Sequence, residues 1–239
     1  MLGGTVMFKI PILMLLFFSF FFSEKPLQET VNFKRIPDQF KKYSSPELQE
    51  LDAAFNHAPE LSSFFNYLKA KYHIDTAIET GTYQGSTTAL FGRLFDEVHT
   101  IEIAEDTYNA TKDALKSYAN IHCHLGSSEK VLKELLPTVK GKPVLFYLDA
   151  HWLDHWPLLE ELQEIAKTHK DNCIVVIDDI KVPGKKKFPF DAYGNHECSH
   201  EYVKENLGEV FTDYTFHYIL PKSVHSRAKF VAIPKKWQK

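Results

Sequence analysis

The chain has 239 residues, enough for one α/β domain with a sizeable core but too few for two such domains and a tail. Its 28 basic and 31 acidic residues give a net charge of −3, so no overall basic field favours nucleic acid as a partner. Cys123, Cys173 and Cys198 are far apart and odd in number, which indicates reduced thiols rather than a disulfide framework or a paired metal knuckle.

Residues 1–23 form a hydrophobic segment unlike the rest of the chain. The run IPILMLLFFSFFF over 10–22 is uncharged, and Lys9 is the one charge within residues 2–22. This length fits either an uncleaved membrane anchor or the hydrophobic part of a cleaved signal peptide. More basic residues follow the segment than precede it, which predicts membrane association through residues 2–22 with a cytoplasmic globular part. A cleaved signal would instead predict export.

The polar and charged stretch 24–45 is expected to be a linker, so that a single domain covers 46–239. Two helices are predicted at the start of this domain, over 45–55 and 59–72. Each has a proline near its first turn, and apolar residues recur three and four positions apart.

From Asp75 onward, short apolar runs alternate with amphipathic stretches. Strands are predicted at 76–80, 97–103, 121–126, 143–149 and 173–179. Helices are predicted between them at 86–95, 105–118, 128–137 and 157–169. A helix at 200–211 precedes two strands, 214–220 and 229–234, which no helix separates and which should pair antiparallel at the sheet edge. The pattern is typical of a Rossmann-like, doubly wound α/β sheet of seven strands, mostly parallel with an antiparallel last strand.

The first predicted strand ends in E-T-G-T-Y-Q-G-S, residues 79–86, at the sheet edge where open α/β folds bind ligands. The stretch lacks the Lys of a phosphate-binding loop and the G-x-G-x-x-G spacing of a dinucleotide site. Gly81 and Gly85 allow the backbone to approach a ligand closely. Glu79 would repel a pyrophosphate and favours a ligand with a cationic end. The alternative is a tight strand-to-helix turn that binds nothing.

The next two predicted strands also end in polar residues. Glu102 ends the second strand, where a carboxylate can accept hydrogen bonds from both hydroxyls of a ribose. The alternative for Glu102 is a surface acid without a ligand. Gly126, Ser127 and Ser128 follow the third strand and offer small polar groups to the edge of an adenine.

The order of these parts resembles the class I S-adenosylmethionine-dependent methyltransferases. In that family the first strand leads into an E/D-x-G-x-x-x-G loop, the second ends in an acid that binds the ribose, and the last of seven strands is antiparallel. IETGTYQGST, TIEI and the final strand pair match this pattern, over about residues 70–235. Many members carry an acid in the third loop, where this chain has Ser127.

The resemblance implies S-adenosylmethionine as the cofactor. The residues that it places at the cofactor are Glu79, Gly81, Thr82, Tyr83, Gly85, Ser86, Glu102, Ile103, Gly126, Ser127, Ser128, Asp149 and His151.

Acids also follow the fourth and fifth predicted strands. Asp149 ends FYLD, and Asp178 and Asp179 end CIVVIDD. Three carboxylates that converge without a basic partner are costly unless they are protonated or bind a cation, and oxygen ligands favour Mg²⁺. The run D-D-I-x-V-P-G resembles the metal-dependent O-methyltransferases of the catechol and macrolide-sugar kinds, in which such acids hold Mg²⁺ at the substrate hydroxyl. A magnesium site is therefore predicted at these three residues, with helix capping and solvated loop acids as the alternative.

A base is needed to take the proton of the hydroxyl. The catechol-type enzymes use a Lys shortly after the fourth-strand Asp, where this chain has Trp152. We expect His151 to act as base or water ligand, with His155 as the second candidate, beside Asp149. The alternative for either histidine is a surface or helix-start residue. The loop over 181–202 is expected to be a mobile substrate lid.

The sequence therefore predicts a methyltransferase that uses S-adenosylmethionine, with Mg²⁺, to methylate the oxygen of a small hydroxylated molecule. A homo-oligomer remains open. Two alternatives are an NAD- or nucleotide-dependent oxidoreductase and a catalytically inactive, methyltransferase-like binding module. The absence of a phosphate loop and the presence of Glu79 argue against the oxidoreductase.

Overall fold

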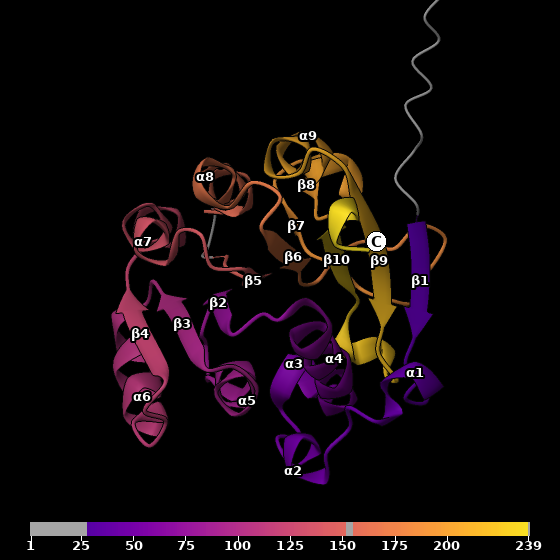
Figure 1. Cartoon of the computed structure of the whole chain (residues 1–239), viewed down its shortest axis with the longest axis horizontal. Coiled ribbons are helices and arrows are strands. Elements are labelled where there is room, and N and C mark those ends of the chain that lie inside the picture. The colour runs from indigo at the N-terminus through magenta and orange to yellow at the C-terminus, as the bar shows by residue number, and fades with distance from the viewer. Residues whose placement is uncertain (1–27, 152–154, 239) are drawn as a thin grey trace, which may run out of the picture.

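The computed structural model describes residues 28–151 and 155–238 (Figure 1). The hydrophobic segment 1–23 and Trp152 lie outside the described residues. Within the described ranges, no helix is both long and apolar enough to cross a membrane.

One mixed β-sheet organises the fold. Its strands are β1 (Gln28–Asn32), β2 (Thr76–Thr80), β3 (Glu97–Glu102), β4 (Ile121–Leu125), β5 (Val144–Leu148), β6 (Cys173–Ile177), β9 (Tyr214–Leu220) and β10 (Lys229–Pro234). They lie side by side in the order β1-β9-β10-β6-β5-β2-β3-β4, and only β10 runs antiparallel to its neighbours. The predicted Rossmann-like, doubly wound sheet with an antiparallel last strand is confirmed. Strand order reverses between β2 and β5, which are hydrogen-bonded neighbours.

The sheet has eight strands rather than seven because β1 forms within the stretch expected to be a linker. β1 pairs parallel with β9 and so covers the edge that the final strand pair was expected to form. Phe33 and Phe40, which follow it, are buried, and their rings stack with centroids 5.5 Å apart. These two residues anchor the stretch to the hydrophobic core, although its overall polarity suggested a linker.

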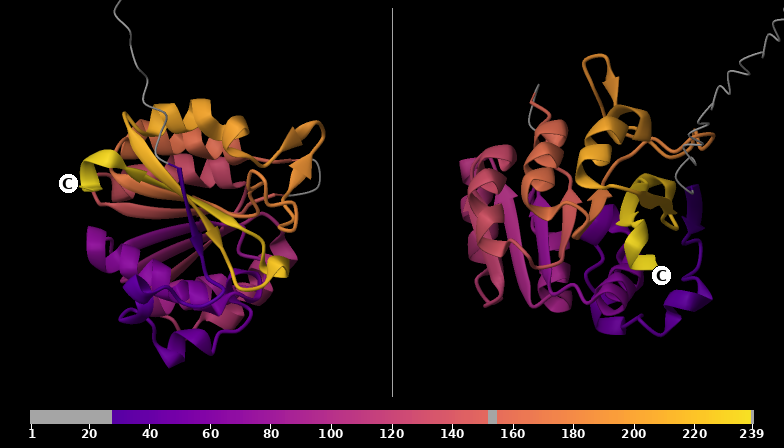
Figure 2. Two further views of the ribbon diagram at one scale, coloured as in Figure 1. Left: turned by 90° about the vertical axis from the view of Figure 1, so that its right-hand side faces the viewer. Right: turned by 45° about the horizontal axis from the view of Figure 1, so that its top comes forward.

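Helices cover both faces of the sheet (Figures 1 and 2). They are α1 (Asp38–Lys41), α2 (Pro46–Gln49), α3 (Ala54–His57), α4 (Ser62–Tyr72), α5 (Ser86–Leu94), α6 (Glu105–Leu115), α7 (Ser128–Leu135), α8 (Leu158–His169) and α9 (His200–Val210). Helices α7, α8 and α9 pack on one face, and α3, α4 and α5 pack on the other. A hairpin of β7 (Ala192–Tyr193) and β8 (His196–Glu197) projects from the stretch that was expected to be a lid (Figure 2).

The helix predicted over 45–55 is interrupted. It is replaced by α2 and the short α3, in which Phe55, Asn56 and His57 have φ of 55°, 57° and 62°. Left-handed backbone is rare for residues other than glycine and persists only where tertiary contacts hold it. The Phe55 amide donates to Thr87 Oγ1 at 3.0 Å, and the His57 carbonyl accepts from Ser226 Oγ at 3.2 Å.

Two hydrophobic cores result from the strict alternation of side chains along the buried strands. In β5, Phe146 and Leu148 face one core, and Leu145 and Tyr147 face the other. Tyr147 lies in an aromatic cluster with Phe55, Phe65 and Phe91, at centroid distances of 5.5 to 6.0 Å. This cluster reaches the carboxyl end of the sheet and joins core packing to the residues described below.

Three histidines lie together near the β4 edge of the sheet. His99 on β3 stacks against His122 and His124 on β4, and its Nδ1 lies 3.0 Å from His124 Nε2. Burial lowers the pKa of His99 to about 4, and the neighbouring imidazoles act in the same direction. The folded protein therefore holds this histidine neutral in a pH range where the unfolded chain protonates it.

We predict that His99 makes the protein sensitive to acid. Because the pKa of His99 is lower in the folded state, the contribution of His99 to stability should fall by about 2 kcal/mol as the pH drops from 7 to 5, while the buried acids Glu79 and Glu161 act in the opposite direction. In urea unfolding at both pH values, the change in stability from pH 7 to pH 5 should therefore be more favourable in His99→Gln than in the wild type by about 2 kcal/mol. The matched control is His225→Gln at an exposed histidine, which should keep the wild-type difference. An equal pH dependence in wild type and His99→Gln would refute the assignment.

Candidate functional site

A cavity of about 480 Å³ opens at the carboxyl ends of β2 to β6, where the sequence placed the site. The loops that follow these five strands line it, together with Asn56 from α3. Its volume lies in the range typical of small-molecule sites. The cavity lies across the point where strand order reverses, which is where open α/β sheets bind their ligands.

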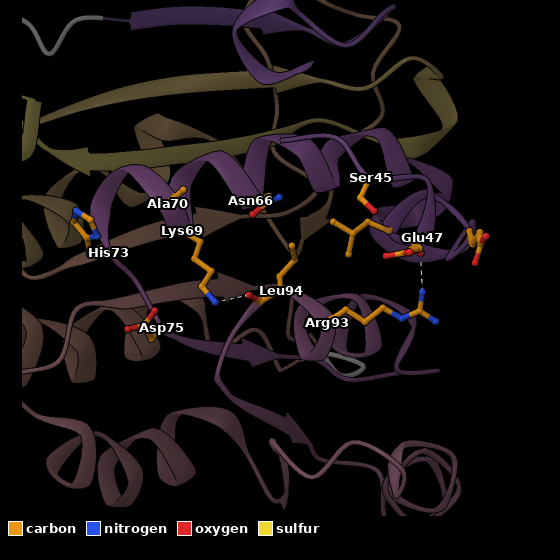
Figure 3. Close-up of a pocket in the computed structure, with 11 residues that line it drawn as sticks. Ser45, Glu47, Asn66, Lys69, Ala70, His73, Asp75, Arg93 and Leu94 are labelled. Atoms are coloured by element: carbon orange, nitrogen blue, oxygen red, sulfur yellow. Dashed lines mark hydrogen bonds between the residues drawn. The ribbon is translucent and has the colours of Figure 1, made fainter. Parts of the chain in front are cut away.

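A larger groove of about 840 Å³ lies at the opposite end of the sheet (Figure 3). Helices α2, α4 and α5 line it, and Asp75 in its wall directly precedes β2. Its cations are already used: Lys69 donates to the Leu94 carbonyl at 2.8 Å, and Arg93 donates to the Glu47 carbonyl at 2.7 Å (Figure 3). We therefore take the cavity at the carboxyl ends as the candidate site.

The glycine loop after β2 packs directly against the end of β5. Gly81 has φ of 84°, and a Cβ added there would come within 2.6 Å of the Asp149 carbonyl oxygen. Gly85 has φ of 74° and directly precedes α5, so both glycines are required by the turn itself. Gly81 and Tyr83 line the cavity. Their neighbour Thr82 is buried, with its hydroxyl 2.6 Å from that of Thr100.

Glu79 does not reach the cavity, contrary to the contact predicted for it. Its side chain is buried, and Oε2 accepts hydrogen bonds from the hydroxyls of Thr88 and Thr100. Burial raises the pKa of Glu79 to about 7. Side chains alternate between the two faces of the sheet along β2, and that of Glu79 lies on the face where Thr88 of α5 and Thr100 of β3 contact it. Glu79, Thr82, Gly85 and Ser86 therefore support the loop from behind, outside the cavity lining.

Glu102 lines the cavity and is held in place by the backbone. Its Oε2 accepts from the Tyr83 amide and its Oε1 from the Ala104 amide, each at 2.9 Å. Tyr83 and Ile103 beside it are 70% and 37% exposed, although both are large and apolar. A carboxylate flanked by exposed apolar surface is suited to a ligand that has hydroxyls and a flat apolar part.

The loop after β4 brings small polar groups to the same cavity. The Gly126 amide donates to the Glu102 carbonyl at 2.8 Å, and Ser127 and Ser128 both line the cavity. Ser127 Oγ donates to Glu129 Oε2 at 2.5 Å and lies 3.3 Å from His155 Nε2.

His155 therefore belongs to the β4 end of the cavity. It lies 3.5 Å from Glu129 Oε2, among groups expected to meet an adenine rather than an acceptor hydroxyl. This placement argues against the catalytic role predicted for His155. Glu129 was not predicted; it supplies an acid to the third loop two positions after Ser127.

The predicted magnesium site is not supported, because two of its three carboxylates, Asp178 and Asp179, have basic partners. Asp178 accepts from the Lys229 ammonium and the Tyr147 hydroxyl, and Arg227 donates to Asp179. Among the residues that the structure describes, no group of three or more acids, histidines or cysteines is arranged to hold a metal ion. The premise that the acids converge without a cation was wrong. Antiparallel β10 pairs with β6 and carries Lys229 to the carboxyl end of that strand.

Asp149 and His151 lie at the β5 end of the cavity and line it. Burial raises the pKa of Asp149 well above its usual value, and the negative charges of Asp178 and Asp179 add to this effect. His151 is half exposed, with Nε2 3.7 Å from Asp191 Oδ2. A carboxylate and an imidazole thus face the same end of the cavity.

Left-handed backbone gathers around this site. Three of the non-glycine residues with positive φ, Asn56, Tyr83 and Asp179, line the cavity. Arg227, with φ of 54°, donates to Asp179 and also to Asp191. Strained backbone of this kind is held by its surroundings and is concentrated at functional sites.

Glu161 on α8 is a buried acid that sequence patterns did not reveal. It is fully buried, its Oε1 accepts from the Ser128 hydroxyl, and within the described residues its Oε2 has no hydrogen-bond partner. Burial raises its pKa to about 7. In the sequence it appears as one of two adjacent acids in an amphipathic helix. Only the packing of α8 distinguishes it from the solvated Glu160.

Comparison with known proteins identifies the fold. No family model matches the chain, and no curated protein matches its sequence. A similar solved structure is the O-methyltransferase TomG from Streptomyces achromogenes, involved in tomaymycin synthesis and solved with S-adenosylmethionine. It has a TM-score of 0.58 at 15% identity, over 80% of this chain and 90% of that chain.

Two further matches are of the same kind. The O-methyltransferase from Bacillus cereus, solved with S-adenosylhomocysteine, has a TM-score of 0.56 at 15% identity, over 80% of this chain and 92% of its own. A putative caffeoyl-CoA O-methyltransferase from Staphylococcus aureus has a TM-score of 0.52 at 16% identity, over 81% and 93%. The chain has the Rossmann-like fold of S-adenosylmethionine-dependent O-methyltransferases.

Proposed function

We propose that this protein is an S-adenosylmethionine-dependent methyltransferase that methylates a hydroxyl of a small molecule. The observation that carries the proposal is Glu102, whose carboxylate two backbone amides fix at the wall of the cavity. The amides leave lone pairs of both oxygens available, so Glu102 can accept hydrogen bonds from a pair of ribose hydroxyls. The chain's fold and the cavity's place at the reversal of strand order support the same reading.

The residues present fit the cofactor. Glu102 would hold the ribose, Ile103 and Tyr83 would cover the adenine, and Ser127 and Ser128 would meet its polar edge. Gly81, which lines the cavity, would lie beside the methionine end. Bound there, the cofactor supplies a methyl group activated by its sulfonium.

The acceptor would bind at the β5 and β6 end of the cavity, between Asn56, Asp149 and His151. Asp149 is the proposed proton acceptor, because this residue lines the cavity and burial raises the pKa of its carboxyl. With the cofactor bound, Asp149 would take the proton of the acceptor hydroxyl while the methyl group is transferred to the oxygen of that hydroxyl. Asp191 lies close enough to His151 to orient its ring.

The proposal differs from the magnesium-assisted reaction expected from the sequence. No step passes through a metal ion, because Lys229 and Arg227 already pair with the acids after β6. The hydroxylated acceptor follows from Asp149 as a base at the wall of the cavity.

We predict that Glu102→Gln weakens cofactor binding. Loss of the charged acceptor should reduce the affinity for S-adenosylhomocysteine about 10- to 100-fold, as measured by calorimetric titration. The matched control is Glu105→Gln, an exposed acid that begins α6, which should bind as the wild type does. Binding of NAD in place of S-adenosylhomocysteine would overturn the proposal in favour of an oxidoreductase.

Asp149→Asn should separate binding from turnover. The amide keeps the shape of the side chain but cannot take a proton, so transfer of a labelled methyl to a panel of hydroxylated acceptors should fall about 100-fold or more. Affinity for S-adenosylhomocysteine should change by less than about threefold, because Glu102 is untouched. Asp106→Asn, at an exposed acid on α6, serves as the control. Full turnover in Asp149→Asn would exclude Asp149 as the base.

A further inference from the structure

We propose that Lys229 and Arg227 act as built-in cations at the acids after β6, so that this protein works without a divalent metal ion. The statement about turnover rests on the proposed methyltransferase function. The statement about metal binding does not, and it is tested separately. Both residues are positioning residues, because neither lines the cavity.

The ammonium of Lys229 occupies one side of Asp178. The side chains of Lys229 and Asp178 are 0% and 1% exposed, and they form an ion pair. Lys229 Nζ also donates to the Ser226 carbonyl at 3.2 Å. A buried ammonium without a carboxylate would be strongly unfavourable, so the pair is held together by its isolation from water.

Two further donors contact the carboxylate of Asp178. Its Oδ1 accepts from the Asp179 amide at 2.6 Å in addition to Lys229, and its Oδ2 accepts from the Tyr147 hydroxyl. A divalent ion would have to displace donors that are already in hydrogen-bond contact and would meet the repulsion of the ammonium. These contacts disfavour Asp178 as a metal ligand in the folded protein.

Arg227 forms an ion pair with Asp179, as Lys229 does with Asp178. Its guanidinium bridges Asp179 and Asp191, and Asn56 Nδ2 lies 3.5 Å from the other oxygen of Asp179. Arg227 and Asp179 have φ of 54° and 53°. Both backbones thus adopt an uncommon conformation that brings the two charges together, which points to a fixed pair rather than a chance surface contact.

The two cations reduce the negative charge of a group of four aspartates. Asp149, Asp178, Asp179 and Asp191 lie around one small cavity of about 20 Å³ beneath the site. Lys229 and Arg227 offset two of these four negative charges. Other proteins neutralise such acids with a bound cation, whereas here Lys229 and Arg227 neutralise Asp178 and Asp179. Asp149 is then left to take a proton.

The test measures metal binding directly, in the full-length protein, with Mn²⁺ and Mg²⁺ as probes. Wild type should show no Mn²⁺ binding by electron paramagnetic resonance and no rise in melting temperature in millimolar Mn²⁺ or Mg²⁺. Its turnover should survive treatment with EDTA. Lys229→Met keeps the length of the side chain but removes the ammonium, so Mn²⁺ should now bind and raise the lowered melting temperature of the variant.

Arg227→Gln is the second variant, since loss of a buried lysine could prevent folding. Arg227 is partly exposed, so this variant should fold and also gain Mn²⁺ binding. Lys187→Gln, at an exposed lysine, is the control and should behave as wild type. Mn²⁺ binding by wild type, or no gain in either folded variant, would overturn the role assigned to the two cations.

Loss of turnover in EDTA would overturn metal independence. These outcomes are distinct from failure of the proposed function. A protein that does not bind S-adenosylhomocysteine would still give an interpretable Mn²⁺ titration.

Discussion

The ion pair between Lys229 and Asp178 depends on the direction of a single strand. β10 runs against β6, so the residue that begins β10 lies beside the residues that end β6. A parallel strand in this place would carry its first residue to the far end of the sheet. The reversal therefore delivers a cation to the edge where the fold collects its acids. Burying the pair costs solvation, which the Tyr147 hydroxyl and the Asp179 amide help to offset.

Tyr147 connects this charged group to the packing of the domain. Its ring belongs to the aromatic cluster with Phe55, Phe65 and Phe91, while its hydroxyl bonds Asp178. Packing of α3 and α4 against the sheet thus fixes the position of an acid near the site. The fold alone does not determine such details. The similar solved structures share the fold at about 15% identity, and a shared fold does not fix the charges at the strand ends.

The local patterns of the sequence were sufficient for most of the fold and for the location of the site. Alternating apolar runs and amphipathic stretches identified the sheet strands β2 to β6, β9 and β10, and the carboxyl ends of β2 to β6 located the cavity. Gly81 and Glu102 could be selected because their roles depend on a turn and on a strand end, which are local features. β1 was missed because its pairing with β9 joins residues far apart in the chain, and its composition is polar.

The predictions that failed concern contacts between distant elements. Glu79 was expected in the cavity, but the alternation of β2 turns it toward Thr88 and Thr100. The magnesium site was predicted from acids that are near one another in sequence, while their partner Lys229 lies some fifty residues away. Lys229 does leave a signal, since it begins the otherwise apolar run KFVAIP. A lysine at the start of a buried strand indicates an acid opposite it.

The left-handed turn of α3 bears on how the acceptor site can evolve. Contacts from α5 and from the residues before β10 fix the backbone of this wall of the cavity. The side chain of Asn56, which lines the cavity, adds one long contact to Asp179, at 3.5 Å. Substitution of Asn56 by a residue that also tolerates left-handed backbone can alter which molecule is recognised without relocating the wall or the acids opposite it. At this position the choice of substrate can change while the backbone of the site stays in place. Related proteins can therefore diverge in substrate and retain one mechanism.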